Sequence, residues 1–552
     1  MKRRIKSSFL VATLPYISLL VWLVPLLVFN HQQQSLIAHD EGTYAWRARW
    51  IVEYSDWLNP AIIYYGKTPG IYWLIASSFS LFGISETTAR LPSMVFSIIS
   101  AFLIYEIGKI IINKQVGWLA AAILSVEFFW LQYSRMTAPD IPLASFVLLG
   151  IWCLLKAELQ PKKRLIWGFG VGLSFGLGFL IRSYMIFLPM LALMPYLIWE
   201  HRRHRHFTNP AIYLGLLIGL IPTIFWLFTS WAFYRTTKFA EMFDFIVHLN
   251  SEERNGNGIF YYVWNIPAKV FPWAFMGLIG LKVALANPIS RYQLILVGFP
   301  IVLFVEISLF STRIPHYALS LYPFIALLAA LALDWLGKIY QNKLAQNRSL
   351  PRILSYVLGG LSFLLLIASL IVFMGVAIPG IEIDAEIQNY AAIAFALGLG
   401  WLIVPLVWIG YHQLGQQFLT ARYWLAGWLL GPWLALAVAG VTGFLGDYNP
   451  EVKTFLQQPQ IASVVQNHPI NFVEGGGKTG VLLRFYTPHL GQIAENISDL
   501  PKDSYAWVKP EIASRSKLPY NLVGTIRDVQ LVQVLKTANT QKQNSSSLGQ
   551  GF

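Results

Sequence analysis

Asp40 and Glu41 form an acidic pair directly after the first long apolar stretch of a chain that has only 27 acidic residues among 552. Other charged or titratable side chains adjoin the ends of later apolar stretches: Lys67, Arg135, Asp140, Arg182, Arg313 and His316. Arginine forks and the point charge of a lysine both suit phosphate oxygens. A carboxylate held among such cations stays ionised near neutral pH and is able to accept a proton. These residue types predict a site that binds a phosphorylated headgroup beside a general base.

The composition excludes an ordinary soluble domain. Hydrophobic residues make up 56% of the chain and charged residues only 12%, and the charged share is about half the usual one. Lipid must therefore be the solvent for most of the apolar surface. The formal charge of +14 would suggest nucleic acid in a soluble protein, but here the basic residues cluster in short loops, which indicates membrane topology and no nucleic-acid partner. The single cysteine, Cys153, excludes an intrachain disulfide.

Thirteen apolar runs approach the length of about 20 residues that a membrane-spanning helix needs. We predict spans near residues 8–30, 88–110, 115–132, 139–157, 163–181, 183–200, 210–233, 267–288, 291–311, 316–338, 351–379, 389–412 and 421–445. The first run follows the basic sequence Met1–Arg4, but it is too long for a signal peptide and no small-residue cleavage site follows it.

Alternate loops between these runs hold clusters of lysine and arginine, for example at 2–6, 162–164, 202–205 and 338–352. The positive-inside rule assigns these loops to the cytoplasm of a multi-pass protein in the inner (plasma) membrane. The opposite, extracytoplasmic side then carries a long first loop (31–87), a loop at 234–266 and the tail after residue 446. The acidic pair and the other charged residues named above all fall on this outer side.

The fold class predicted is therefore an all-α polytopic membrane domain over residues 1–445, with about thirteen transmembrane helices. Within the outer loop 31–87, apolar residues recur at helical spacing and predict amphipathic interfacial helices. Residues 446–540 predict a small extracytoplasmic α/β domain, with candidate strands at Ile470–Val473, Tyr505–Val508, Leu522–Ile526 and Val529–Leu535. The polar residues 541–552 predict a disordered tail.

Each candidate residue also has a structural interpretation. Asp40 could be the N-cap of a helix that begins at Glu41, whose charge would complement the helix dipole. Lys67 lies in a turn-rich segment where a solvated lysine is the plain alternative. Arg135 and Asp140 could simply pair with each other. These alternatives stay open on sequence alone.

Several motifs, in order, resemble the membrane-embedded glycosyltransferases of the ArnT and protein O-mannosyltransferase (dolichyl-phosphate-mannose-protein mannosyltransferase) type, which have the GT-C fold. The resemblance is strong over about residues 10–340. The motifs are His39–Tyr44, Asp56–Pro60, Tyr65–Leu74, Leu81–Glu86, Ala89–Pro92, Ser134-Arg135 with Asp140–Pro142, Phe271–Trp273, and Arg313–Tyr317 with Leu321–Pro323.

The resemblance implies roles for individual residues. Asp40 would be the catalytic base, and Asp140 a second outer acid that supports the site or the acceptor. Lys67 would bind the phosphate of a polyprenyl-phosphate sugar donor. The remaining candidates fall into two groups, with Arg135, Arg313 and His316 near the donor phosphate and Glu41, Tyr44, Tyr65 and Arg182 supporting the site.

This chain also departs from the pattern of its relatives. Many relatives have an acid before the lysine and Pro-Pro after it, where this chain has Gly66 and Thr68-Pro69. Relatives often carry a lysine near the position of Arg182.

The implied activity is transfer of one sugar, with inversion, from a polyprenyl-phosphate donor to an extracytoplasmic lipid, glycan or protein acceptor. A lipid phosphate is a good leaving group, so no cofactor is required, although a divalent cation near Asp40 and Glu41 is an open alternative. The rival hypothesis is a transporter or flippase of lipid-linked sugars, which predicts charged residues at mid-bilayer depth and discontinuous helices. A third is a non-catalytic assembly subunit on the same scaffold. The sequence names neither the sugar nor the acceptor.

Overall fold

The computed structural model describes residues 2–30, 34–63, 66–235, 238–251, 256–341, 349–376, 382–473, 477–515 and 519–535. The chain forms two compact units, one of residues 1–34 with 47–447 and one of residues 35–46 with 448–552. Two predictions, the role of Tyr65 and the disordered tail at 541–552, lie outside the described residues.

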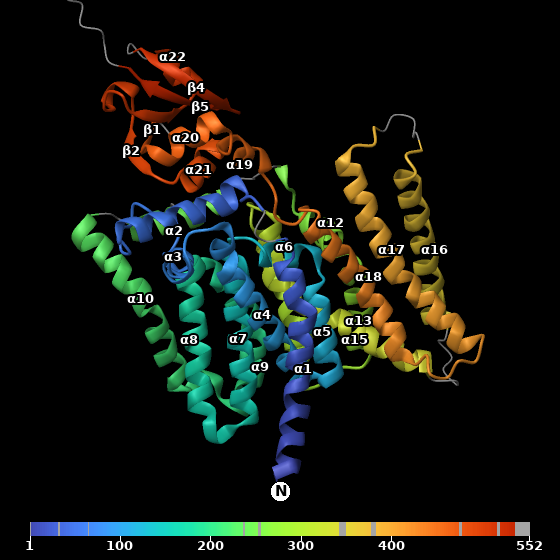
Figure 1. The fold of residues 1–552 in the computed structure, drawn as a ribbon. Coiled ribbons are helices and arrows are strands. Elements are labelled where there is room, and N and C mark those ends of the chain that lie inside the picture. Colours follow the sequence, from blue (N-terminus) through green and yellow to red (C-terminus); the bar gives the residue numbers. More distant parts are fainter. Residues whose placement is uncertain are drawn as a thin grey trace, which may run out of the picture. The chain divides into compact units, whose positions relative to one another are not determined.

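The first unit is helical, and short 3-10 or π turns interrupt or join its helices (Figure 1). Its helices are α1 (Lys2–Val28), α3 (Gly70–Phe82), α4 (Glu86–Ile111), α5 (Lys114–Ser125), α6 (Phe128–Ser134), α7 (Asp140–Leu159), α8 (Arg164–Arg182), α9 (Phe187–His204), α10 (Pro210–Tyr234), α11 (Lys238–Ser251), α12 (Tyr261–Lys269), α13 (Trp273–Ala286), α14 (Phe299–Leu309), α15 (Tyr322–Gln341), α16 (Ser349–Phe373), α17 (Ala385–His412) and α18 (Ala421–Val441). The short turns are η3 (Pro161–Lys163), η4 (Ser183–Ile186), η5 (His206–Thr208), η7 (Leu294–Gly298) and η8 (Pro315–Leu321). Helix α2 (Thr43–Tyr54) begins in the second unit and ends in the first.

The predicted polytopic helical architecture is confirmed, but the number of thirteen spans is not. Within the described residues, eight helical stretches are long and apolar enough to cross a membrane, or up to ten if each of two bent pairs is one span. One of the eight, Pro161–His204, has 44 residues and would be roughly 66 Å long if straight. Instead Arg164 Nη2 donates a hydrogen bond to the carbonyl oxygen of Arg205 at 2.6 Å. The two ends of this stretch therefore meet, and the chain reverses between α8 and α9.

Small residues let α8 and α10 pack very closely. A Cβ atom added to Gly172 of α8 would lie 1.9 Å from the carbonyl oxygen of Ile212, and one added to Gly215 of α10 would lie 2.1 Å from that of Phe169. Backbone contact at this distance is the usual purpose of glycines spaced four apart in membrane helices, because dispersion rather than the hydrophobic effect holds such helices together. The packing fixes the end of α8, where Arg182 lies.

The second unit contains the predicted α/β fold. Its five-stranded sheet has the order β2-β1-β3-β5-β4, with β1 parallel to β2 and β3 and with β5 antiparallel to β3 and β4. Its strands are β1 (Ile470–Val473), β2 (Leu490–Ala494), β3 (Tyr505–Val508), β4 (Tyr520–Ile526) and β5 (Val529–Val534). Its helices are α19 (Pro450–Leu456), α20 (Pro459–Asn467), α21 (Gly477–Tyr486) and α22 (Pro510–Arg515), with the short turn η9 (Ile497–Asp499). The π turn η2 (Ala38–Gly42), which carries the acidic pair, belongs to the same unit.

Candidate functional site

A buried ion pair joins the start of α7 to the end of α8. Asp140, the first residue of α7, pairs with Arg182, the last residue of α8, and the two are only 6% and 5% exposed. The guanidinium of Arg182 also lies over the ring of Tyr317, 5.6 Å from its centroid. The partner of Asp140 that the structure shows is thus Arg182, where the sequence had suggested Arg135. Both members of the pair line a narrow cavity together with His316 and Tyr317.

The loop before α3 is fastened to the end of α8. The Thr68 hydroxyl accepts a hydrogen bond from the Ser183 amide at 3.1 Å and donates one to the carbonyl of Phe179 at 3.2 Å. The Ser183 hydroxyl in turn donates to the carbonyl of Gly66 at 3.3 Å. Ser183 has a φ of 44°, which is uncommon for a residue other than glycine. The two neighbours of Lys67 are thus bonded to the residue that follows Arg182.

His316 lies close to Lys67 as well as to the Asp140–Arg182 pair. Its Nδ1 lies 3.1 Å from the Tyr133 hydroxyl, and Lys67 and Arg182 both lie within electrostatic range of its ring. The structure therefore brings together four predicted site residues of the first unit, Lys67, Asp140, Arg182 and His316. This cluster, which we call the α7–α8 cluster, carries two basic side chains, one carboxylate and a histidine.

Two of the predicted phosphate ligands, Arg135 and Arg313, donate hydrogen bonds to backbone carbonyls. Arg135 is 1% exposed, and its guanidinium donates to the carbonyls of Leu26, Phe29 and Leu445 at 2.6, 2.6 and 3.2 Å. These bonds tie α6 to the ends of α1 and α18. These three acceptors are neutral carbonyls, and phosphate binding by Arg135 stays a prediction.

Arg313 has a similar environment. It donates to the carbonyls of Ser308 and Asn257 at 2.9 and 2.8 Å, and the Asn257 amide donates back to the carbonyl of Arg313 at 2.7 Å. The arginine thereby braces the segment that leads into η8 and His316. Its role in binding the donor also remains a prediction.

The glycine at position 66 excludes the acid that many relatives carry there. Gly66 has a φ of 69°, a conformation that side chains rarely adopt, and an added Cβ would lie 2.5 Å from the ring of Phe245. The local backbone therefore leaves no room for a carboxylate before Lys67.

The acidic pair lies in the second unit, and its two members differ in environment. Glu41 is fully buried, and its Oε2 accepts a hydrogen bond from the Ile37 amide at 2.9 Å. Asp40 is exposed and lies inside the π turn, whose N-cap residue is Ile37. The alternative in which Asp40 is the N-cap of a helix that begins at Glu41 does not hold, because the helical turn already begins at Ala38. Tyr44, in the first turn of α2, is 8% exposed.

Residues far along the chain hold this segment in place. The Tyr486 hydroxyl accepts a hydrogen bond from the Leu36 amide at 2.9 Å. The backbone amide of Asn449 donates a hydrogen bond to Ser35 Oγ at 2.6 Å, and its side-chain amide donates one to the Leu36 carbonyl at 2.7 Å. Arg484 stacks over the ring of Trp46, 4.9 Å from its centroid. Sequence reasoning missed these residues, since no local pattern links them to the first loop.

Among the residues that the structure describes, no group of three or more His, Cys, Asp or Glu side chains is arranged to hold a metal ion.

Comparisons with known proteins agree with the sequence resemblance. A sequence model of the family described as dolichyl-phosphate-mannose-protein mannosyltransferase matches residues 66–231. An uncharacterized protein of Aquifex aeolicus is 22% identical over 326 residues, which are 56% of this chain and 63% of that protein. Undecaprenyl phosphate-alpha-4-amino-4-deoxy-L-arabinose arabinosyl transferase 2 of Pseudomonas fluorescens is 24% identical over 431 residues, which are 74% of this chain and 68% of that protein. The chain thus spans about two thirds of the length of these relatives.

A solved structure shows the same fold. The crystal structure of ArnT from Cupriavidus metallidurans bound to undecaprenyl phosphate superposes with a TM-score of 0.71 at 19% identity, covering 94% of this chain and 97% of that one. The apo structure of the same protein gives a TM-score of 0.69. The resemblance to the GT-C membrane glycosyltransferases of the ArnT and protein O-mannosyltransferase type is thereby confirmed, and the fold is theirs.

Proposed function

We propose that this multi-pass membrane protein transfers a sugar, with inversion, from a polyprenyl-phosphate donor to an acceptor on the extracytoplasmic side of the inner membrane. The observation that carries the proposal is the α7–α8 cluster, in which Lys67 is bonded through its neighbours to the end of α8 beside the buried Asp140–Arg182 pair. Such a set of charges suits a phosphate monoester or diester at a membrane boundary. The Cupriavidus structure, which has this fold, is described as bound to undecaprenyl phosphate.

In the proposed reaction, Lys67 and Arg182 stabilise the lipid phosphate as it departs. The acceptor oxygen or nitrogen forms a bond to the anomeric carbon while the bond from that carbon to the phosphate oxygen breaks, and the acceptor's proton passes to Asp40. Cations fixed in advance near developing negative charge lower the barrier, because they need no reorganisation during the reaction. The exposed carboxylate of Asp40, on a turn anchored by the buried Glu41, supports its role as base.

An apolar groove in the first unit supports a polyprenyl tail as part of the donor. It has a volume of about 410 Å³ and is lined by side chains of α12, α13, α14 and α15, among them Ile266, Leu278, Phe304 and Ile325. Helix α14 and the turn η8 border this groove and also supply walls of the cavity that holds Asp140 and Arg182. A lipid chain in the groove would therefore have its charged end within reach of the same wall.

The test is release of free polyprenyl phosphate by the purified protein in nanodiscs, with cell-envelope extract as the source of acceptor. One arm offers undecaprenyl phosphate carrying 4-amino-4-deoxy-L-arabinose, and the other offers polyprenyl phosphate carrying mannose. We expect release from at least one donor, and a loss of about 100-fold or more in kcat for Asp40→Asn and for Lys67→Gln. The exposed Lys162→Gln is the matched control and should turn over normally.

Two outcomes would overturn parts of the proposal. Normal turnover by Asp40→Asn would remove the assignment of the base. Movement of the intact donor across the bilayer without any release of polyprenyl phosphate would favour the flippase.

A further inference from the structure

A second charged cavity lies at the other end of α7. Glu158 is 18 residues after Asp140 on the same helix, a separation of about 27 Å along its axis. The cavity beside Glu158 has a volume of about 220 Å³ and is lined from α7, α8, the end of α9 and the start of α10. No step of the proposed transfer uses this cavity.

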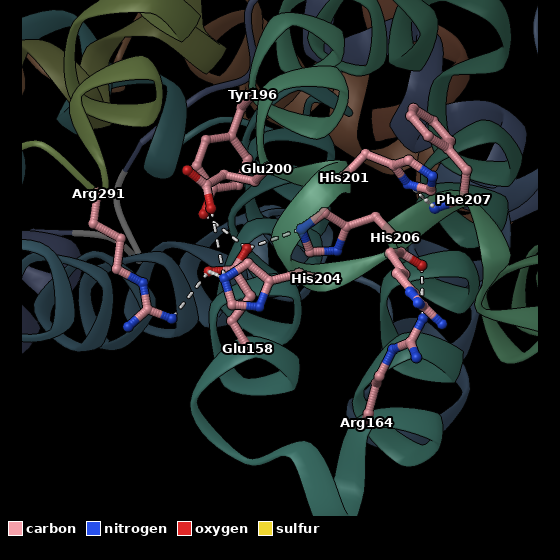
Figure 2. A network of polar contacts seen from close by, with 10 residues as sticks. Glu158, Arg164, Tyr196, Glu200, His201, His204, His206, Phe207 and Arg291 are labelled. Atoms are coloured by element: carbon pink, nitrogen blue, oxygen red, sulfur yellow. Dashed lines mark hydrogen bonds and ion pairs between the residues drawn. The ribbon is translucent and has the colours of Figure 1, made fainter.

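Basic side chains dominate its polar lining. The polar lining consists mainly of three arginines (Arg164, Arg203 and Arg205), two histidines (His204 and His206) and the carboxylate of Glu158. Arg164 lies against the turn at Arg205, to whose carbonyl it donates (Figure 2). Arg203 and Arg205 are exposed, so their charges are accessible to a ligand.

The carboxylate of Glu158 is buried and already has partners within the protein. The side chain of Glu158 is 0% exposed, and it accepts a hydrogen bond from the Tyr196 hydroxyl at 2.7 Å. His206 Nε2 and Arg291 Nη2 lie 3.0 and 3.7 Å from its two oxygens, and dashed lines mark these contacts in Figure 2. What remains for a ligand is the positive charge of the arginines, and the ligand that complements it is an anion.

The walls of the same cavity are apolar. Leu154 of α7, Val171 of α8 and Ile212 of α10 line it together with the basic groups. A free phosphate gains nothing from such walls, whereas a phospholipid places its headgroup on the arginines and the start of its acyl chains on the apolar side chains. The exposed residues Lys162 and Arg202, near the same helix ends, add to the attraction for an anionic membrane surface.

We propose that this cavity binds the headgroup of an anionic phospholipid, such as phosphatidylglycerol or cardiolipin, between the ends of α7, α8, α9 and α10. Basic pockets between membrane helices are a recurring way to hold such lipids. The bound lipid links four helices at the end opposite the α7–α8 cluster. The inference does not depend on the transferase activity.

The experiment is native mass spectrometry of the full-length protein, delipidated in detergent and titrated with phosphatidylglycerol or phosphatidylcholine. We expect preferential retention of phosphatidylglycerol. Affinity should fall about fivefold in Arg203→Gln and about 25-fold in Arg203→Gln/Arg205→Gln. Arg202→Gln removes a neighbouring arginine that does not line the cavity, and it is expected to change the affinity much less.

A melting curve of each variant without added lipid confirms that it is folded before it is titrated. A third arm uses glycerol 1-phosphate alone. If glycerol 1-phosphate binds saturably and as tightly as the lipid, the ligand of the cavity is a soluble phosphate ester and not a phospholipid. Equal retention of the two lipids, or equal losses in Arg202→Gln and Arg203→Gln, would overturn the proposal.

Discussion

The Asp140–Arg182 pair can be separated into its structural and chemical parts by a double-mutant cycle. Both side chains are almost completely buried, so removing either one leaves an uncompensated charge in a poorly hydrated place. Asp140→Asn and Arg182→Gln should each lower the free energy of unfolding by about 3–5 kcal/mol. The double variant leaves two neutral groups that are able to bond to each other, so its loss should be smaller than the sum of the single losses by about 3 kcal/mol.

Activity should not follow stability in this cycle. If Arg182 stabilises the departing phosphate, the double variant regains thermal stability in nanodiscs but still releases polyprenyl phosphate about 100-fold more slowly than the unmodified protein. If the two single losses simply add, the claim that Asp140 and Arg182 stabilise each other is refuted. Full turnover by the stable double variant would refute a chemical role for Arg182 and leave it as a support for α7 and α8.

Two further predictions concern the segments that carry Lys67 and Asp40. Gly66→Ala forces a side chain into a left-handed conformation and against the ring of Phe245, so it should lower the free energy of unfolding by about 1–3 kcal/mol. Adding Phe245→Ala should recover only the part of this loss that is due to the clash. A melting curve of Gly66→Ala like that of the unmodified protein would contradict the packing described. Tyr486→Phe removes the acceptor of the Leu36 amide and should lower the free energy of unfolding by about 1–2 kcal/mol. It should also lower kcat, because the turn that carries Asp40 is held less firmly. Tyr520→Phe in the same domain is the control, and an unchanged kcat in Tyr486→Phe would show that this hydrogen bond does not contribute to the reaction.

Local patterns predicted the elements better than the partnerships between them. The strands at Ile470–Val473 and Tyr505–Val508 were readable from short apolar runs bounded by turn residues and match the structure. Strand β2 was missed because Leu490–Ala494 contains a glycine and a glutamine and is half-exposed at the edge of the sheet. The reversal at Ser183 was predicted as a break between two spans, since polar residues interrupt the apolar run there. The union of residues 35–46 with residues 448–535 was not predicted, because contacts across 400 residues leave no local period.

The charged residues at the outer helix ends show why charge alone does not identify a site. Arg135, Arg182 and Arg313 are all at least 94% buried, and each follows or precedes an apolar stretch. Arg135 and Arg313 donate to backbone carbonyls, whereas Arg182 pairs with a carboxylate. The carbonyl bonds of Arg135 and Arg313 cross-link segments of the chain, whereas Asp140 and Arg182 pair beside a narrow cavity that they line. The partners of these arginines, and not their number, therefore distinguish the two that cross-link the backbone from Arg182, which pairs with an acid.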